Sequence, residues 1–301
     1  MSPALMSVNL TSFPWPPLSE RGARPIWTGR GFEVNGDRVP IAAYDIGASG
    51  WNDALTTMHE DLAGTAHPID VASRRHAVDQ LTRHLVRPDG VVMEVGCSSG
   101  YLLQDIRRAL PEASLIGVDY VRGPLEALAG SMPTVPILQF DLTRCPLPDA
   151  CIDAVVLLNV LEHIEDDVSA IRQLSRILKP GGVAVIEIPA GPGLFDVYDK
   201  QLMHFRRYRR KDAVSLFQNA GFQVVKSSHL GFSVYPGFWA VKKKNRLFAK
   251  EQHAAEVVAK DIKSSGSSKL LSSLLNLELK LGEKVSFPFG IRCLLTCRKP
   301  V

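Results

Sequence analysis

A glycine-containing stretch, Val91–Gly100, is the first pattern in this chain that could perform chemistry. An apolar run that contains Glu94 ends at Gly96, and three small residues separate Gly96 from Gly100. Because glycine has no Cβ, such a turn can adopt positive φ angles and let a ligand approach its backbone closely. A helical pattern begins directly afterwards. The stretch therefore predicts a strand, a tight turn and a helix that bind a ligand where the strand ends.

Polar residues follow three later apolar runs in the same way. Asp119, Asp141 and Asn159 each stand directly after such a run. In an open parallel sheet, ligands bind outside the carboxyl ends of the strands, at the point where the strand order reverses. We therefore expect these side chains and the 96–100 turn to converge on one crevice.

These strand-end residues resemble the cofactor site of the class I S-adenosylmethionine-dependent methyltransferases. The residues that carry the resemblance are Glu94, Gly96, Ser98, Gly100, Asp119 and Asp141. It extends through Leu158–His163, Leu178–Gly182 and residues 199–208, covers about residues 75–229, and is nearest to the UbiE/UbiG-like branch. Ser98 stands where the family often has glycine, and a small residue should be tolerated there.

The resemblance implies the fold, the cofactor and the reaction. It implies an α/β, Rossmann-like fold whose seven-stranded, mostly parallel sheet carries helices on both faces, with an N-terminal extension and an insertion before the last strand. It implies S-adenosyl-L-methionine as the cofactor and a methyltransferase as the enzyme. We expect O-methylation of a small or lipid- or sugar-linked acceptor that could be anionic.

The resemblance also assigns roles to single residues. Those expected to bind the cofactor are Glu94, Gly96, Cys97, Ser98, Gly100, Asp119, Tyr120, Asp141, Leu142 and Asn159. Asp119 would accept hydrogen bonds from the ribose hydroxyls, because an ionised carboxylate only accepts. Asp141 with Leu142 would receive the adenine, and Glu94 with the turn would hold the methionine part. The alternative is that Asp119 and Asp141 only cap the helices that follow them.

Two histidines are the candidate catalytic residues. His163 follows the fourth strand and could take a proton from an acceptor hydroxyl, since histidine titrates near neutral pH. It could equally anchor its loop through a hydrogen bond. His204 opens a cluster after the fifth strand, where substrate-facing loops occur.

The same cluster holds the candidate substrate-binding residues. We expect Arg206, Arg207 and Tyr208, with His204, to shape the acceptor pocket, because planar guanidinium groups suit carboxylates and phosphates. The alternative is that one arginine pairs with Asp196 or Asp199 and holds a lid.

Other functional classes compete with this interpretation. Gly96–Gly100 also satisfies G-x-S-x-G, the nucleophile elbow of α/β-hydrolases with Ser98 as nucleophile, but the large Tyr101 follows where an elbow needs a small residue. A nicotinamide-dependent dehydrogenase would need glycine at 98 and 101. A non-catalytic cofactor-binding scaffold protein remains open.

Hydrophobic periodicity places the elements that would position these residues. Strands are expected near 91–95, 114–119, 135–140, 153–159, 183–188, 222–228 and 291–298. Helices are expected at 53–63, 68–86, 100–110, 122–130, 166–178 and 211–220. Right-handed crossovers would place these helices on both faces of the sheet. By the resemblance, the last strand runs antiparallel between the fifth and the sixth.

The chain is expected to divide into two parts. Residues 1–67 would form an N-terminal arm, a hairpin over Phe32–Ile41 and a helical extension, and residues 68–301 the methyltransferase domain. Within that domain, 230–290 would be a lid-like insertion between the last two strands. Its aromatic and basic part, 231–246, could make peripheral membrane contact, and its leucine-rich part predicts a helix on an apolar surface. A lid on the protein's own site is the favoured interpretation, and a partner chain is equally compatible.

Composition sets the remaining bounds. The net charge of +4 in 301 residues is too small to indicate a nucleic-acid partner, although cations concentrate at 199–250. The sequence contains no run of about 18 apolar residues, which a membrane-spanning helix would need, so a cytoplasmic location is expected. The five cysteines show no paired metal-binding spacing, and Cys293 and Cys297 are expected to pack in a core. No metal site is expected.

Overall fold

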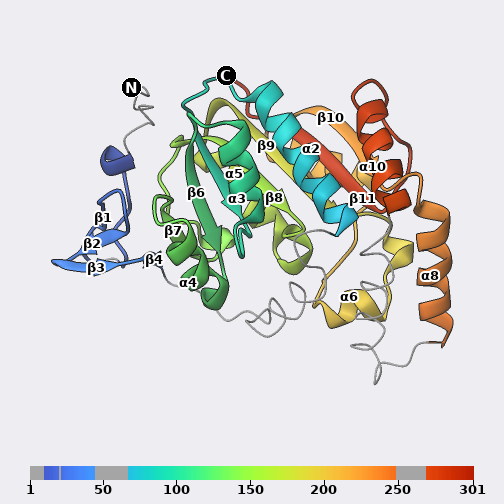
Figure 1. Cartoon of the computed structure of the whole chain (residues 1–301), viewed down its shortest axis with the longest axis horizontal. Helices are drawn as coiled ribbons and strands as arrows, with labels where there is room; N and C mark the ends of the chain where they lie inside the picture. Colours follow the sequence, from blue (N-terminus) through green and yellow to red (C-terminus); the bar gives the residue numbers. More distant parts are fainter. Residues whose placement is uncertain (1–9, 20–21, 45–66, 249–268) are drawn as a thin grey trace.

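The computed structural model describes residues 10–19, 22–44, 67–248 and 269–301, and its centre is an eight-stranded sheet (Figure 1). In sheet order the strands are β10 (Gln223–Leu230), β11 (Arg292–Arg298), β9 (Leu178–Pro189), β8 (Ile152–Leu158), β5 (Val91–Val95), β6 (Ser114–Asp119), β7 (Ile137–Gln139) and β4 (Ile41–Ala43). β11 is antiparallel to both neighbours, and the other pairs are parallel. The strand order reverses at β5, so a ligand crevice is expected at its carboxyl end.

The predicted α/β, Rossmann-like fold is confirmed, with one more strand than expected. β11 lies between β9 and β10, as predicted for the antiparallel last strand. The additional strand is β4, which comes from the segment assigned to the N-terminal extension and pairs in parallel with β7. Its three residues are too few to give a period-2 pattern in the sequence.

Helices cover both faces of the sheet, as predicted. The longer helices are α2 (Pro68–His84), α3 (Tyr101–Ala109), α4 (Arg122–Ser131), α5 (Asp167–Ile177), α7 (Arg210–Asn219), α8 (Tyr235–Phe248) and α10 (Lys269–Gly282). Residues of α2, α3 and α4 share one core, and residues of α5 and α7 share the other. Because side chains alternate along a strand, β5 supplies Met93 to one core and Val92 to the other. Cys293 and Cys297 are buried in the core, as predicted.

The described part of the N-terminal segment packs against the body through aromatic residues. The predicted hairpin is confirmed: β2 (Phe32–Val34) and β3 (Asp37–Val39) flank Asn35 and Gly36, whose φ angles of 54° and 89° suit a tight hairpin turn. β2 also pairs with β1 (Ile26–Trp27). Trp15 is 3% exposed and meets the Phe32 ring edge-on at 5.1 Å between centroids. The helix predicted at 53–63 lies outside the described residues.

The segment between β10 and β11 contains two helices that lie on different parts of the molecule (Figure 1). α10 packs beside α2, and Leu275 is buried between them, so the predicted leucine-rich helix on an apolar surface is confirmed. Glu278 of α10 is 4% exposed and accepts hydrogen bonds from the N–H groups of Phe232 and Ser233 and from the Ser233 hydroxyl, at 2.8–3.0 Å. No helix among the described residues is long and apolar enough to cross a membrane.

We expect Glu278→Ala to lower the free energy of unfolding by about 2 kcal/mol, because it removes three hydrogen bonds that join a buried carboxylate to the partly buried β10–α8 connection. Denaturant unfolding measures this. Glu283→Ala is the matched control: Glu283 pairs with Arg83 at 3.0 Å, both side chains are about half exposed, and such a pair contributes less than about 1 kcal/mol. Equal losses in the two variants would contradict the assignment.

Candidate functional site

The 96–100 turn is fixed by backbone hydrogen bonds and by close packing. The N–H groups of Gly96 and Cys97 donate to the Val118 carbonyl at 2.8 and 3.0 Å, so the turn is joined to β6. Gly96, Ser98 and Gly100 have φ angles of 76°, 41° and 77°. A Cβ on Gly96 would lie 2.5 Å from Val160 Cγ2, which comes directly after β8 and Asn159. The ends of β5, β6 and β8 therefore meet at this turn, as the sequence predicted.

Asp119 connects the end of β6 to the turn. Its Oδ2 accepts from the Ser98 N–H and its Oδ1 from the Val121 N–H, both at 2.9 Å. The alternative of local capping thus describes part of what this carboxylate does. The contact with Ser98, which is 21 residues away in sequence, goes beyond a cap and holds the turn in place.

Glu94 is a buried acid at the same crevice. It is 6% exposed, and its Oε2 has no hydrogen-bond partner among the described residues. Burial, and then the charge of Asp119, raises the pKa of Glu94 well above its ordinary value. An uncompensated buried carboxyl oxygen beside a ligand crevice fits a donor supplied by a bound molecule.

Asp141 caps the short helical turn that follows β7. Its Oδ1 accepts from the Thr143 N–H and hydroxyl, both at 2.8 Å, and Leu142 is buried in the core. This is the capping arrangement that the sequence analysis set as the alternative, and the adenine role of both residues stays a prediction. Tyr120 accepts from Gln139 Nε2 through its carbonyl at 2.9 Å.

Asn159 belongs to a polar network that the sequence analysis missed. Its Nδ2 donates to Glu187 Oε1 at 3.2 Å, and its Oδ1 accepts from Arg292. Glu187 is 1% exposed and also accepts from the Ser73 hydroxyl at 2.8 Å. Glu187 could have been recognised from the sequence, because it is the single acid inside the apolar run of β9, whereas no local pattern marks Arg292.

The two candidate catalytic histidines lie together. The rings of His163 and His204 meet edge-on with centroids 4.7 Å apart. The Phe205 N–H donates to the Glu162 carbonyl at 2.8 Å, which joins the two loops. Glu162 is fully buried beside them, and burial raises its pKa to about 8. Sequence reasoning missed Glu162, because its burial depends on the loop around residue 204.

Asp199 is the centre of a buried charge cluster on the acceptor side. It accepts from His204 Nδ1 at 2.9 Å and from Arg207 Nε at 2.7 Å, and Lys242 of α8 lies 3.3 Å away. Burial alone would raise the pKa of Asp199, but the bond from His204 and the nearby cations hold it far below its ordinary value. Lys242 also pairs with Asp196 at 2.6 Å. The geometry of Arg207 thus favours the alternative from the sequence analysis, in which an arginine pairs with Asp199.

Arg206 and Tyr208 share a different carboxylate. Arg206 pairs with Asp167 at 2.7 Å, and the Tyr208 hydroxyl donates to the same carboxylate at 2.7 Å. Tyr208 is buried, whereas the Arg206 side chain is 31% exposed. Of the predicted substrate-binding residues, Arg206 is therefore the best placed to reach a ligand, and the role of all three stays a prediction.

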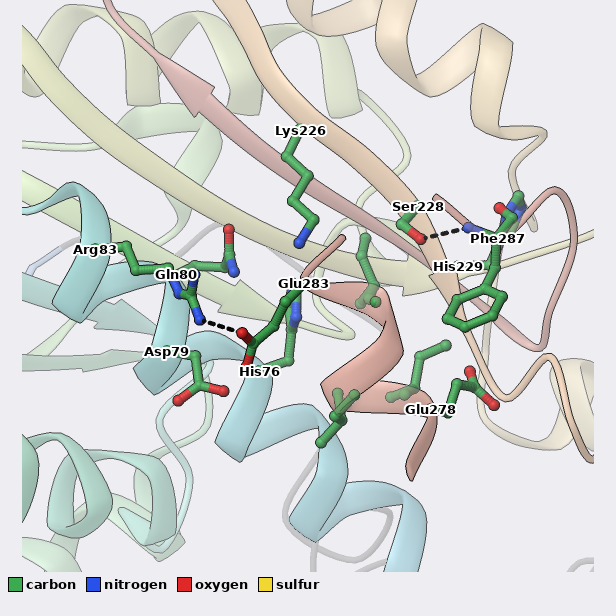
Figure 2. Close-up of a pocket in the computed structure, with 14 residues that line it drawn as sticks. His76, Asp79, Gln80, Arg83, Lys226, Ser228, His229, Glu278, Glu283 and Phe287 are labelled. Atoms are coloured by element: carbon green, nitrogen blue, oxygen red, sulfur yellow. Dashed lines mark hydrogen bonds and ion pairs between the residues drawn. The ribbon is translucent and has the colours of Figure 1, made fainter. Parts of the chain in front are cut away.

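A small cavity lies away from these residues, between α2, β10 and α10 (Figure 2). Figure 2 shows Arg83 paired with Glu283 and Ser228 accepting from the Phe287 N–H at one side. Its charges are mixed, since Lys226 faces the same space as Asp79. None of the predicted site residues lines this cavity.

Comparison with known proteins identifies the central segment. Residues 93–186 match the family model described as a methyltransferase domain. The comparisons support a class I S-adenosylmethionine-dependent methyltransferase domain over this segment. The comparisons do not single out the UbiE/UbiG-like branch, and none of them supports the hydrolase alternative.

Relatives and solved structures agree with this assignment. A probable S-adenosylmethionine-dependent methyltransferase of Mycolicibacterium smegmatis is 32% identical over 158 residues, which are 50% of this chain and 59% of that protein. A trans-aconitate 2-methyltransferase of Azoarcus sp. is 30% identical over 115 residues, 38% of this chain and 45% of that protein. The phosphoethanolamine N-methyltransferase 2 of Haemonchus contortus, solved with S-adenosyl-L-methionine, shares the fold with a TM-score of 0.54 at 14% identity, covering 82% of this chain and 57% of that one.

The chain spans about half to three fifths of the length of the first curated relatives it matches. S-adenosylmethionine is the cofactor named for the similar curated methyltransferases, and the residues at the crevice fit it. Asp119 offers acceptor oxygens beside the turn, and Glu94 Oε2 lacks a partner among the described residues.

We expect Gly100→Ala to destabilise this methyltransferase domain by about 2–3 kcal/mol. Residue 100 has a positive φ, which alanine rarely adopts, and the new Cβ would lie 2.3 Å from Leu128 Cδ1. Thermal or denaturant unfolding measures the loss. The control is Gly130→Ala in α4, where a Cβ would meet nothing within 4 Å, and which should stabilise the helix by about 0.5–1 kcal/mol. An unchanged free energy of unfolding in Gly100→Ala would contradict this expectation and show that the turn accommodates a Cβ.

Proposed function

We propose that this chain transfers the methyl group of S-adenosylmethionine to an oxygen of a small or lipid- or sugar-linked acceptor. The observation that carries the proposal is the convergence of the 96–100 turn, Asp119 and the buried Glu94 at the carboxyl end of β5. When bound, the cofactor supplies a methyl group activated by its sulfonium. The protein therefore has mainly to align the acceptor with that group and to exclude water.

The cofactor half of the proposed site uses acceptor oxygens. The Asp119 oxygens accept the Ser98 and Val121 N–H groups and, as carboxylate acceptors at the crevice, would also accept from the ribose hydroxyls. Glu94 Oε2 is available for a donor from the methionine part. Asp141, Leu142 and Asn159 would form the wall toward the adenine and the transferable methyl group.

The acceptor half combines apolar and cationic groups. Phe205 and Met203 are 52% and 40% exposed, and the Arg206 guanidinium lies over the Phe205 ring at 5.9 Å. This combination suits an acceptor with an apolar part and an anionic group. An anionic acceptor also agrees with the trans-aconitate 2-methyltransferase relative, because trans-aconitate is a tricarboxylate. His163 would accept the proton that the acceptor hydroxyl loses.

The insertion would act as a lid that is tied to the acceptor half. Lys242 of α8 is 3% exposed and paired with Asp196 and Asp199, so it is not part of a basic outer surface as the sequence suggested. Trp239 and Val241 are 45% and 41% exposed, and Lys243 lies over the Trp239 ring at 4.9 Å. We keep peripheral membrane contact through this side of α8 as part of the proposal. We also propose that residues 1–67 form an N-terminal extension and residues 68–301 the methyltransferase domain, with β4 of the extension joining the central sheet.

Asp119→Asn should weaken binding of S-adenosylmethionine by at least about tenfold, because it removes the charge and leaves one amide oxygen, which can accept from only one of the Ser98 and Val121 N–H groups. Calorimetric titration with S-adenosylmethionine and its demethylated product measures both affinities. Asp149→Asn, an exposed acid paired with Arg176 at 2.8 Å, is the control and should bind like the unsubstituted protein. If well-folded unsubstituted protein binds neither compound, the proposed function is wrong.

The two adjacent arginines should behave differently. Arg207→Gln should cost about 3 kcal/mol of unfolding free energy, because it unbalances the fully buried Asp199. Arg206→Gln should cost less than about 1 kcal/mol, because Tyr208 still donates to Asp167. Once an acceptor is found, Arg206→Gln should raise its KM about tenfold, which is the loss of one charge-assisted hydrogen bond. An unchanged KM together with lowered stability would remove Arg206 from the acceptor pocket.

A further inference from the structure

Three residues with metal-ligating side chains gather beside the acceptor half. Glu162 and His163 come from the short turn Leu161–His163 that follows β8, and His204 comes from the loop after α6 (Val197–Gln201). One potential ligand atom from each lies within 4.8 Å of the other two. The hydrogen bond from the Phe205 N–H to the Glu162 carbonyl fixes the two segments against each other. The cluster is therefore built by the fold and does not depend on a chance meeting of surface side chains.

The burial of Glu162 and the lack of hydrogen-bond partners for its carboxyl group point to a bound cation. Its residue exposure is 0%, and neither carboxylate oxygen has a hydrogen-bond partner among the described residues. A buried carboxyl group without a hydrogen-bond partner reduces stability whether it is ionised or protonated, and native proteins rarely keep one unless something compensates it. Both oxygens are thus unused by the described protein groups and lie next to two imidazoles.

The contact between His204 and Asp199 leaves one ring nitrogen of His204 available as a metal ligand. Its Nδ1 lies 2.9 Å from Asp199 Oδ1. Asp199 also accepts from Arg207 and pairs with Lys242, so it is ionised and can only accept, which places the His204 proton on Nδ1. The lone pair is then on Nε2. A carboxylate that fixes the far nitrogen of a ligating histidine is the usual outer partner in metal sites.

We propose that Glu162, His163 and His204 bind one divalent transition-metal ion of the zinc class. Two imidazoles and one carboxylate suit Zn²⁺ and its first-row neighbours better than Mg²⁺ or Ca²⁺. Ligand bonds of about 2.0–2.2 Å require the three atoms to lie within about 4.4 Å of one another, so a small side-chain movement from the present separation completes the site.

The ion would have a position open for an exogenous oxygen, because three protein ligands leave at least one coordination position vacant. Val160, three residues before His163, packs against Gly96 of the cofactor turn. An acceptor hydroxyl bound at the open coordination position would lose its proton to solvent more readily, and His163 would then serve as a metal ligand and not as the base. This last step rests on the proposed methyl transfer, whereas the metal site itself does not.

The test is a titration of the full-length chain with Zn²⁺ alone, after treatment with a chelator and its removal. Calorimetry gives stoichiometry and affinity, and substitution with Co²⁺ gives a visible spectrum that reports the ligand geometry. The variants are Glu162→Gln and His204→Gln. The matched control is His84→Gln, at the end of α2, whose side chain is outside the cluster.

We expect one Zn²⁺ per chain, at least about tenfold weaker binding in each of the two variants, and unchanged binding in the control. Glu162→Gln removes a buried charge that has no partner, so it should fold, and circular dichroism with thermal melting checks this. The proposal is overturned if folded, unsubstituted protein binds no stoichiometric Zn²⁺, if Mg²⁺ binds more tightly than Zn²⁺, or if both variants bind Zn²⁺ as the unsubstituted protein does.

Parallel titration with S-adenosylmethionine separates the two proposals. Cofactor binding without Zn²⁺ binding would overturn the metal site and leave methyl transfer in place. Zn²⁺ binding that is lost in both variants, without cofactor binding, would support the metal site and overturn methyl transfer.

Discussion

The acceptor half of this protein depends on one buried carboxylate, that of Asp199. It is fully buried and receives a hydrogen bond from His204, a hydrogen bond from Arg207 and the charge of Lys242. These partners come from the loop after α6 and from α8, so one charge joins the site loop to the insertion. Taking that charge out of water is costly, and only the combined donors compensate it. Removing any one of them would leave this buried charge less well compensated.

The cofactor half is built differently, from backbone geometry. The turn after β5 needs positive φ at Gly96, Ser98 and Gly100, and the side chains of Val160 and Leu128 occupy the space that a Cβ would fill at the two glycines. Hydrogen bonds from the turn to Val118 and Asp119 hold it rigidly against β6. The result is a surface of backbone and acceptor oxygens that is preorganised before any ligand arrives.

Three buried glutamates lie on three neighbouring strands of the sheet. Glu94 is in β5, Glu162 follows β8, and Glu187 is in β9; each has an oxygen without a hydrogen-bond partner among the described residues. Such groups reduce stability, and they are retained where the surrounding fold compensates for them at a functional site. Their position places three buried carboxyl groups at the carboxyl ends of β5, β8 and β9, where the proposed ligands would bind.

The sequence by itself determined the glycine turn, the hairpin and all strands of the central sheet except β4, because these depend on local spacing. Periodicity located β5, β6, β8 and β11 to within about two residues, and Asn35–Gly36 marked the hairpin turn. The tertiary structure decided which polar side chains are paired. Asp141 proved to cap its own turn, Lys242 proved to be buried instead of basic surface, and Glu162 met His204 from some forty residues away. Burial and pairing depend on contacts between distant segments, which no local pattern records.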